Sequence, residues 1–493
     1  MEERNYEQIR KQDAAPPAGS MMESLRDLGY STEAAVSDII DNAIFAKATT
    51  VWINFIWDGN KSRIVFKDDG NGMFEEELIQ AMRPGSQSPA SARDLSDLGR
   101  FGLGLKTASL SQCRMFTVIS KKKSESLTFW RWDLDYVTSP KTEGWTILNV
   151  AEKGDIELIE EMDQGTLVSW DYLDRIIELN KKKYTEDYFY LVAEKVKRHI
   201  EMVFHRYLET GKLKIIFNDI PVKAWDPFLR GETATQPFPE EIMENGSIKI
   251  KAYILPHRSK LDESVWIDNE QREGGWDALQ GFYIYRNERL LLAADWLGIT
   301  RKKSHYKLAR IMIDLPNNVD HEWQIDIKKS RARPPLTLRP QLKAIAMSVV
   351  TQAEQIFRHR GKQIQRSLTG DFSFVWKEIV KDGRYFFRIN LEHPVIEKLL
   401  NELPDKKKEI QKLLKIIEET VPGPAIIAKE NEFPDNMLKP FEKTADIEII
   451  SLMKELAVGW KQQGMSDELI KRRLLMTEPF SDYQQLIETL DYE

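Results

Sequence analysis

Alternating apolar and polar positions predict two groups of β-strands along this chain of 493 residues. The first group begins with VWINFIW (51–57) and SRIVFKD (62–68), which are joined by the turn signal Asp58-Gly59-Asn60. Further strands of this group are expected at 114–121, 126–136, 144–150 and 166–171. Helical periodicity is expected over about 21–48, 75–82 and 186–207. The pattern therefore predicts an α/β sandwich, with helices layered on a mixed sheet.

The second group of strands lies at 212–222, 247–255, 281–292 and 309–316. After Pro340 the pattern becomes helical, over 341–365, 394–419 and about 445–474. We therefore expect a flexible lead (1–20), an α/β domain (21–208) with a polar loop near 83–105, a β-rich α/β domain (209–340) and a helical C-terminal region (341–493). In the last region the apolar stripe of Leu452, Leu456 and Trp460 fits core packing better than a dimer or partner face.

Composition narrows the class of protein. Hydrophobic residues make up 42% of the chain and charged residues 30%, as in globular proteins that dissolve in water. No apolar run approaches the roughly 20 residues that span a bilayer, and the single cysteine, Cys113, indicates a reducing cytoplasm. The net charge of −7 provides no global attraction for nucleic acid, although local basic clusters such as Arg301–Lys303 are able to contact phosphates.

The segment Ser37-Asp38-Ile39-Ile40-Asp41-Asn42-Ala43 combines an apolar stripe with three polar side chains. Asp38, Asp41 and Asn42 stand at i, i+3 and i+4, so a helix directs them the same way. A carboxylate can activate water, and a carboxamide oxygen can bind Mg²⁺ without adding charge. Taken alone, this pattern is more often that of an amphipathic surface helix.

Three further segments contain residues that are suited to bind the adenine base or the phosphates of a nucleotide. Asp68-Asp69-Gly70-Asn71-Gly72-Met73 ends a predicted strand, where an aspartate can accept a hydrogen bond from adenine and glycines allow a tight turn against the base. GRFGLGLKT (99–107) exposes backbone N–H groups at a helix start and adds Lys106, which suits a polyphosphate. Its spacing is neither that of a Walker A loop nor that of a dinucleotide fingerprint. Gly165-Thr166 opens a strand and carries no signal alone.

In this order the four segments resemble the N, G1, G2 and G3 boxes of the GHKL superfamily of ATPases, named for gyrase, heat-shock chaperones, histidine kinases and MutL. The chain is most similar to prokaryotic MORC-like ATPases, in which strings similar to IIDNA, DDGNGM and LGRFGLGLKTAS occur. The similarity extends over roughly residues 20–340. It implies the Bergerat fold, followed by a transducer-type domain, with a lid near 83–105 that closes over the nucleotide.

The resemblance implies a role for each matching residue, with ATP and Mg²⁺ as cofactors. Asp38 would be the general base, and Asn42 would bind Mg²⁺. The other nucleotide-binding residues would be Asp68, Gly70, Gly72 and Met73 near the adenine, Thr166 reaching it through water, and Gly99, Gly102, Gly104, Lys106 and Thr107 near the phosphates. The family base is usually glutamate, so Asp38 implies slow hydrolysis. Glu33, ~140° around the helix, is a poor substitute.

ATPases of this family also use a lysine of the following domain to contact the γ-phosphate. The segment HEWQIDIKKSRARPP (321–335) places Lys328 and Lys329 side by side. We assign the γ-phosphate contact to Lys329, with Lys328 as the alternative. If neither lysine has this role, the segment is an ordinary basic turn at the surface. GFYIYRNERLL (281–291) predicts a hairpin through Arg286-Asn287, whose arginines are expected to be exposed and to face either DNA or solvent.

The expected function is that of an ATP-gated clamp. ATP binding would close the lid and join two subunits as a homodimer, and hydrolysis would reopen them. The resemblance implies DNA, and nuclease, helicase or other defence-system subunits, as partners in prokaryotic restriction or antiphage defence, with no membrane involved. A nucleotide-sensing scaffold with little hydrolysis, or a chaperone-like protein, stays open as an alternative because of Asp38.

Overall fold

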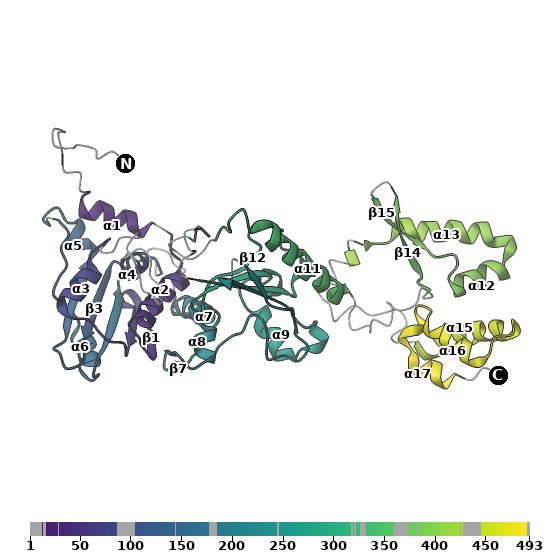
Figure 1. Ribbon diagram of the computed structural model, residues 1–493, viewed down its shortest axis with the longest axis horizontal. Coiled ribbons are helices and arrows are strands. Elements are labelled where there is room, and N and C mark those ends of the chain that lie inside the picture. The colour runs from purple at the N-terminus through teal and green to yellow at the C-terminus, as the bar shows by residue number, and fades with distance from the viewer. Residues whose placement is uncertain are drawn as a thin grey trace. The chain divides into compact units, whose positions relative to one another are not determined.

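The computed structural model forms two compact units, residues 1–361 and 362–493 (Figure 1). The residues that it describes are 12, 16–27, 29–85, 104–142, 144–176, 185–243, 246–316, 319, 322–325, 332–358, 373–381, 384–423, 425, 426 and 445–490. Most of the expected loop at 83–105 therefore lies outside the described residues.

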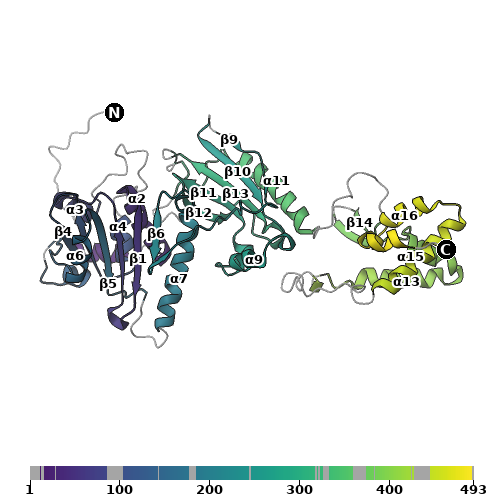
Figure 2. The same cartoon turned by 90° about the horizontal axis from the view of Figure 1, so that it is seen from below.

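A seven-stranded mixed sheet opens the first unit. Its spatial order is β4 (Thr128–Asp133), β3 (Met115–Lys121), β5 (Gly165–Asp171), β2 (Arg63–Asp68), β1 (Thr50–Ile56), β6 (Lys214–Phe217) and β7 (Ile220–Pro221). Neighbouring strands are antiparallel except β1 and β6, which are parallel. Figure 2 shows β6 beside β1.

Two sequence expectations for this sheet need correction. Residues 212–222, expected in the second domain, form β6 and β7 and complete the first sheet. Their alternating pattern predicts a half-buried strand but does not identify its partner. The strand expected at 144–150 is reduced to a single bridge between Arg131 and Leu148.

Helices cover both faces of the first sheet. The larger core lies under α1 (Ala18–Arg26), α2 (Thr32–Phe45), α3 (Glu75–Met82), α4 (Gly104–Leu110) and α7 (Glu186–Val203). On the opposite face, Ile159 of α6 (Lys153–Glu160) packs with residues of β2, β3 and β5. The first domain is therefore an α/β sandwich, as the sequence predicted.

The second sheet of this unit has the order β12 (Arg289–Asp295), β11 (Gly281–Arg286), β13 (Ala309–Leu315), β10 (Ile248–Ile254) and β8 (Gln236–Pro237), with β9 (Glu241–Met243) also paired to β10. Strands β11 and β13 are parallel. One face carries an aromatic cluster with Tyr253, Tyr283 and Tyr285, against which Met202 of α7 packs. This face therefore lies toward the helices of the first domain.

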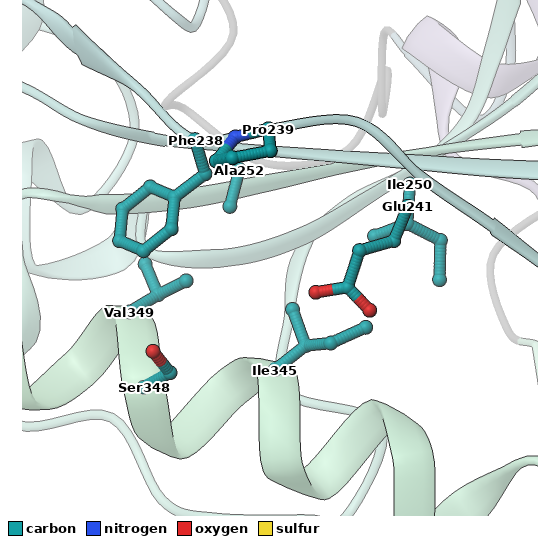
Figure 3. Close-up of a pocket in the computed structure, with 8 residues that line it drawn as sticks. All are labelled: Phe238, Pro239, Glu241, Ile250, Ala252, Ile345, Ser348 and Val349. Carbon is teal, nitrogen blue, oxygen red and sulfur yellow. The ribbon is translucent and has the colours of Figure 1, made fainter.

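Helix α11 (Arg339–Arg358) closes the opposite face of the second sheet. The domain boundary expected at 340 consequently falls within the first turn of a helix that belongs to this core. A small cavity of about 30 Å³ separates β10 from α11, with Phe238 and Glu241 on the sheet side and Ile345, Ser348 and Val349 on the helix (Figure 3). It has room for about one water molecule and contains none of the predicted site residues.

The second unit is mainly helical, as expected, but it also contains a β-hairpin that the periodicity did not reveal. The hairpin pairs β14 (Trp376–Lys381) with β15 (Arg384–Ile389). The helices are α12 (Pro394–Glu402), α13 (Lys407–Thr420), α15 (Ala445–Gln462), α16 (Asp467–Leu475) and α17 (Gln484–Thr489). Leu456 and Trp460 are buried in this unit's own core. None of the helices in the described parts of the chain has the length and apolar character needed to cross a bilayer.

Candidate nucleotide site

Three polar side chains meet at neighbouring strand ends of the first sheet. Strand pairing places Thr166 opposite both Asp68 and Ser120. Because side chains alternate along a strand, these three residues share the face on which Phe66, Val118 and Val168 enter the larger core. The hydroxyl oxygens of Ser120 and Thr166 lie 3.0 Å apart. The sheet face that packs against the helices of the larger core therefore ends in a row of three polar residues, Asp68, Thr166 and Ser120.

Asp68 is the strongest electrostatic feature of this row. Burial raises the pKa of its carboxyl to about 7; a hydrogen bond from the Gly70 N–H opposes the rise, and the charge of Asp69 adds to it. The Gly70 nitrogen lies 2.9 Å from Asp68 Oδ1. Perturbed carboxyl groups of this kind are enriched at binding and catalytic sites. The group is suited to a ligand that brings its own hydrogen-bond donor.

The loop after β2 runs against the end of β3. Gly72 has φ +65°, and a Cβ at this position would lie 2.0 Å from the carbonyl oxygen of Lys121. Gly165 is equally confined, because its Cβ would lie 2.3 Å from the carbonyl oxygen of Asp68. The Met73 N–H donates to Ser120 Oγ at 2.9 Å. The second and fourth sequence segments are therefore in direct contact and form one cradle.

Helix α2 carries the first segment. Ser31 caps its N-terminus, accepting from the Ala34 N–H. The three polar residues of the segment differ in exposure, since Asp38 and Asp41 are buried and Asn42 is exposed. Asp38 Oδ2 accepts a hydrogen bond from the Tyr30 hydroxyl at 3.0 Å, and a Cβ on Gly104 would lie 3.8 Å from the same oxygen. The predicted base therefore lies beside the start of α4.

The described part of the third segment forms α4. Lys106 is 2% exposed, its Nζ donates to the Ala81 carbonyl at 2.8 Å, and burial lowers its pKa to about 8. Thr107 is also buried. To contact a phosphate, Lys106 would have to exchange this carbonyl for the ligand. Gly99 and Gly102 lie outside the described residues.

The second domain contacts the site helix through its hairpin. The hairpin forms as predicted, but its turn is Asn287-Glu288, both with positive φ, rather than Arg286-Asn287. Arg286 and Arg289, expected to be exposed, are 5% and 4% exposed. The hairpin packs on the first domain, and Arg289 pairs with Asp41 of α2, so these two arginines do not form a DNA-facing surface. Lys328 and Lys329 lie outside the described residues, and their role stays a prediction.

Residues 30–166 match the family described as "Histidine kinase-, DNA gyrase B-, and HSP90-like ATPase". The chain therefore carries an ATPase domain of the GHKL superfamily, with the sheet ends and α2 at its candidate site. The protein "ATPase morc-1" of Caenorhabditis elegans is 32% identical over 88 residues, which are 18% of this chain and 10% of that protein. This similarity supports a MORC-like assignment of the domain. The chain matches about a tenth of the length of this relative.

Three residues that the motifs did not indicate complete the geometry. Tyr30 binds Asp38, Ser120 links Met73 to Thr166, and Arg289 binds Asp41. Ser120 stands near the end of a predicted strand. This position indicates contact with Thr166 only once the pairing of the two strands is known. No local signal indicated the other two contacts.

Proposed function

We propose that this protein binds ATP with Mg²⁺ and hydrolyses it slowly. The observation that carries the proposal is the cradle of Asp68, Gly72, Ser120 and Thr166 at the strand ends, with Asp38 beside the start of α4. In this arrangement Asp68 would accept a hydrogen bond from the adenine amino group. The tight approach at Gly72 and Gly165 would leave a flat surface for the base.

Helix α2 would serve the phosphate end of the nucleotide. The exposed Asn42 carboxamide offers an uncharged oxygen of the kind that Mg²⁺ accepts, so the residue present fits the ion. When bound, Mg²⁺ would neutralise charge on the phosphate oxygens. Asp38 would take the proton of the attacking water, with Tyr30 holding its carboxylate.

One experiment separates binding from turnover. ATP affinity, measured calorimetrically with Mg²⁺, should fall at least about 100-fold in Asp68→Ala and Asn42→Ala, because each loses a buried or metal-linked contact. Asp38→Asn should bind ATP within a few-fold of the wild type and lose turnover. Undiminished affinity in both alanine variants would refute the site, and wild-type turnover in Asp38→Asn would refute the base.

The Asp38–Tyr30 hydrogen bond also favours a second candidate function, a nucleotide-sensing scaffold. The Tyr30 hydroxyl donates to Asp38 Oδ2, so it occupies an oxygen that a base would use to accept the proton of the attacking water. In this case the wild type would bind ATP through Asn42 and Asp68 without measurable hydrolysis. The same measurements therefore distinguish the two functions.

We also propose that ATP binding joins two copies of the chain into a clamp on DNA, in a prokaryotic restriction or antiphage setting. The likeness to MORC ATPases supports this wider proposal. Light scattering should give the mass of a monomer with ADP and of a dimer with a non-hydrolysable ATP analogue, and duplex DNA should raise the fraction of dimer. Equal masses in both nucleotides would rule out the clamp.

A further inference from the structure

A buried ion pair joins the second sheet directly to helix α2. Arg289 is the first residue of β12, and its Nε donates to Asp41 Oδ1 at 3.1 Å. Both residues are only 4% exposed. Asp41 is the neighbour of Asn42 and lies nearly one helical turn after Asp38. The pair therefore acts on the helix that carries the proposed magnesium ligand and base.

The hairpin tip that presents Arg289 is fixed from several sides. The Tyr207 hydroxyl donates to the Asn287 carbonyl at 2.6 Å, and Lys212 Nζ lies 2.7 and 2.8 Å from the two carboxylate oxygens of Glu288. Arg289 Nη1 donates to the Leu290 carbonyl at 2.8 Å. The guanidinium is therefore oriented by its own domain and by the residues around α8 (His205–Glu209) before it reaches α2.

The surroundings of Arg289 make Asp41 its ionic partner. Burial, together with the charge of Arg289, lowers the pKa of His199 on α7 to about 4, so this neighbour is neutral at neutral pH. Phe204 presents an aromatic ring 5.8 Å from the guanidinium. Buried ion pairs are often no more stabilising than well-packed apolar residues, and their best-supported contribution is to fix one arrangement of the elements that they join.

We propose that Arg289 is a positioning residue of the nucleotide site. By holding Asp41 it fixes the rotation of α2, and with it the directions of the Asn42 carboxamide and the Asp38 carboxylate. The inference rests on the proposed function. It also gives the second sheet a direct connection to the phosphate end of the site, because a shift of the β11–β12 hairpin would turn α2.

The test uses the full chain with the variant Arg289→Lys, which keeps the charge but not the planar fork. Three quantities are measured: affinity for adenosine, the ratio of ATP affinities with Mg²⁺ and with EDTA, and kcat. Adenosine affinity should stay within about twofold, since Asp68 and its row lie on other elements. The Mg²⁺/EDTA ratio should fall about 10- to 100-fold, as when an outer contact of a metal ligand is lost, and kcat should fall by a similar factor.

Arg206→Lys provides a matched control. Arg206 also joins the first domain to the second sheet, with Nη1 and Nη2 at 2.5 and 3.1 Å from the carboxylate of Asp314 on β13, but it does not reach α2. This variant should leave all three quantities unchanged. The double variant Asp41→Leu/Arg289→Leu replaces the ion pair by an apolar contact. It should fold and show the same losses as Arg289→Lys.

The possible outcomes distinguish a failure of the positioning role from a failure of the proposed function. Wild-type Mg²⁺/EDTA ratio and kcat in Arg289→Lys and in the folded double variant would overturn the positioning role, while the site itself would stand. Equal losses in Arg206→Lys would also overturn it, because they would point to a general effect of the domain contact. Absence of Asn42- and Asp68-dependent ATP binding in the wild-type background would instead overturn the proposed function.

Discussion

Asp68 keeps its carboxyl group close to half-ionised at neutral pH. Its pKa is about 7, mainly because burial penalises the charged form. An ionised carboxylate is the stronger acceptor for an amino group, since charge-assisted hydrogen bonds are roughly twice as strong as neutral ones. Adenine recognition should therefore depend on pH in a range where an ordinary aspartate would be fully ionised.

We predict that affinity for adenosine rises about tenfold between pH 6 and pH 8. With a pKa near 7, the ionised fraction increases from about one tenth to about nine tenths over this interval. Adenosine is the ligand of choice because it has no phosphate that titrates in the same range. The profile is measured by titration calorimetry, with Asp68→Asn as the control that cannot ionise. A flat wild-type profile, or the same slope in both proteins, would contradict the assignment.

At this scale the sequence identified residues that lie together better than it identified their contacts. The motifs indicated Asp68, Gly72 and Thr166, and the structure brings these residues together. The hydrogen bond between Tyr30 and Asp38 was not predictable, because it depends on how the chain before α2 returns to the helix. The burial of Arg289 was misjudged for a related reason: an arginine in a hairpin turn is usually exposed unless a partner elsewhere compensates its charge.

At the scale of elements, local patterns predicted strands and helices more successfully than their neighbours. The expected segment 212–222 forms β6 and β7, but β6 pairs with β1 and β7 pairs with β6, so neither strand joins the second sheet. A parallel neighbour such as β6 is set by the path of α7, which no local pattern encodes. The β14–β15 hairpin was passed over although Asp382-Gly383, between its strands, is a strong turn signal in the sequence.

Helix α2 illustrates how one element serves two purposes. Val36, Ile40 and Ala43 are buried in the first core, so the helix is held by packing on α4 and α7. Its polar residues then have separate partners, with Asp38 bound by Tyr30 and Asp41 by Arg289. The sequence predicted both the apolar stripe and the polar face. It did not predict that this face is divided between the proposed nucleotide site and the second domain.

For the molecule as a whole, the described structure suggests where an independently folding part ends. Helix α11 belongs to the first compact unit, and it supplies Leu342, Ile345, Val349 and Val350 to the core of the second sheet. Burying a side chain of this size contributes roughly 1.5–3 kcal/mol. These four residues together therefore contribute about 6–12 kcal/mol, which is comparable to the total stability of a typical domain, about 5–15 kcal/mol.

We predict that a chain ending at residue 361 folds and binds ATP with wild-type affinity, whereas a chain ending at residue 338 loses the cooperative unfolding of its second sheet. The shorter chain lacks α11, so one face of that sheet would be exposed to water and its apolar surface would favour aggregation. Circular dichroism during thermal unfolding, together with calorimetric titration of ATP, measures both properties.

A weaker and broader unfolding transition is expected in the shorter chain, with reduced ATP affinity because Arg289 would no longer be held against α2. If both chains unfold with the same midpoint and cooperativity, α11 is dispensable, and the domain boundary lies near residue 340 as the sequence pattern first indicated.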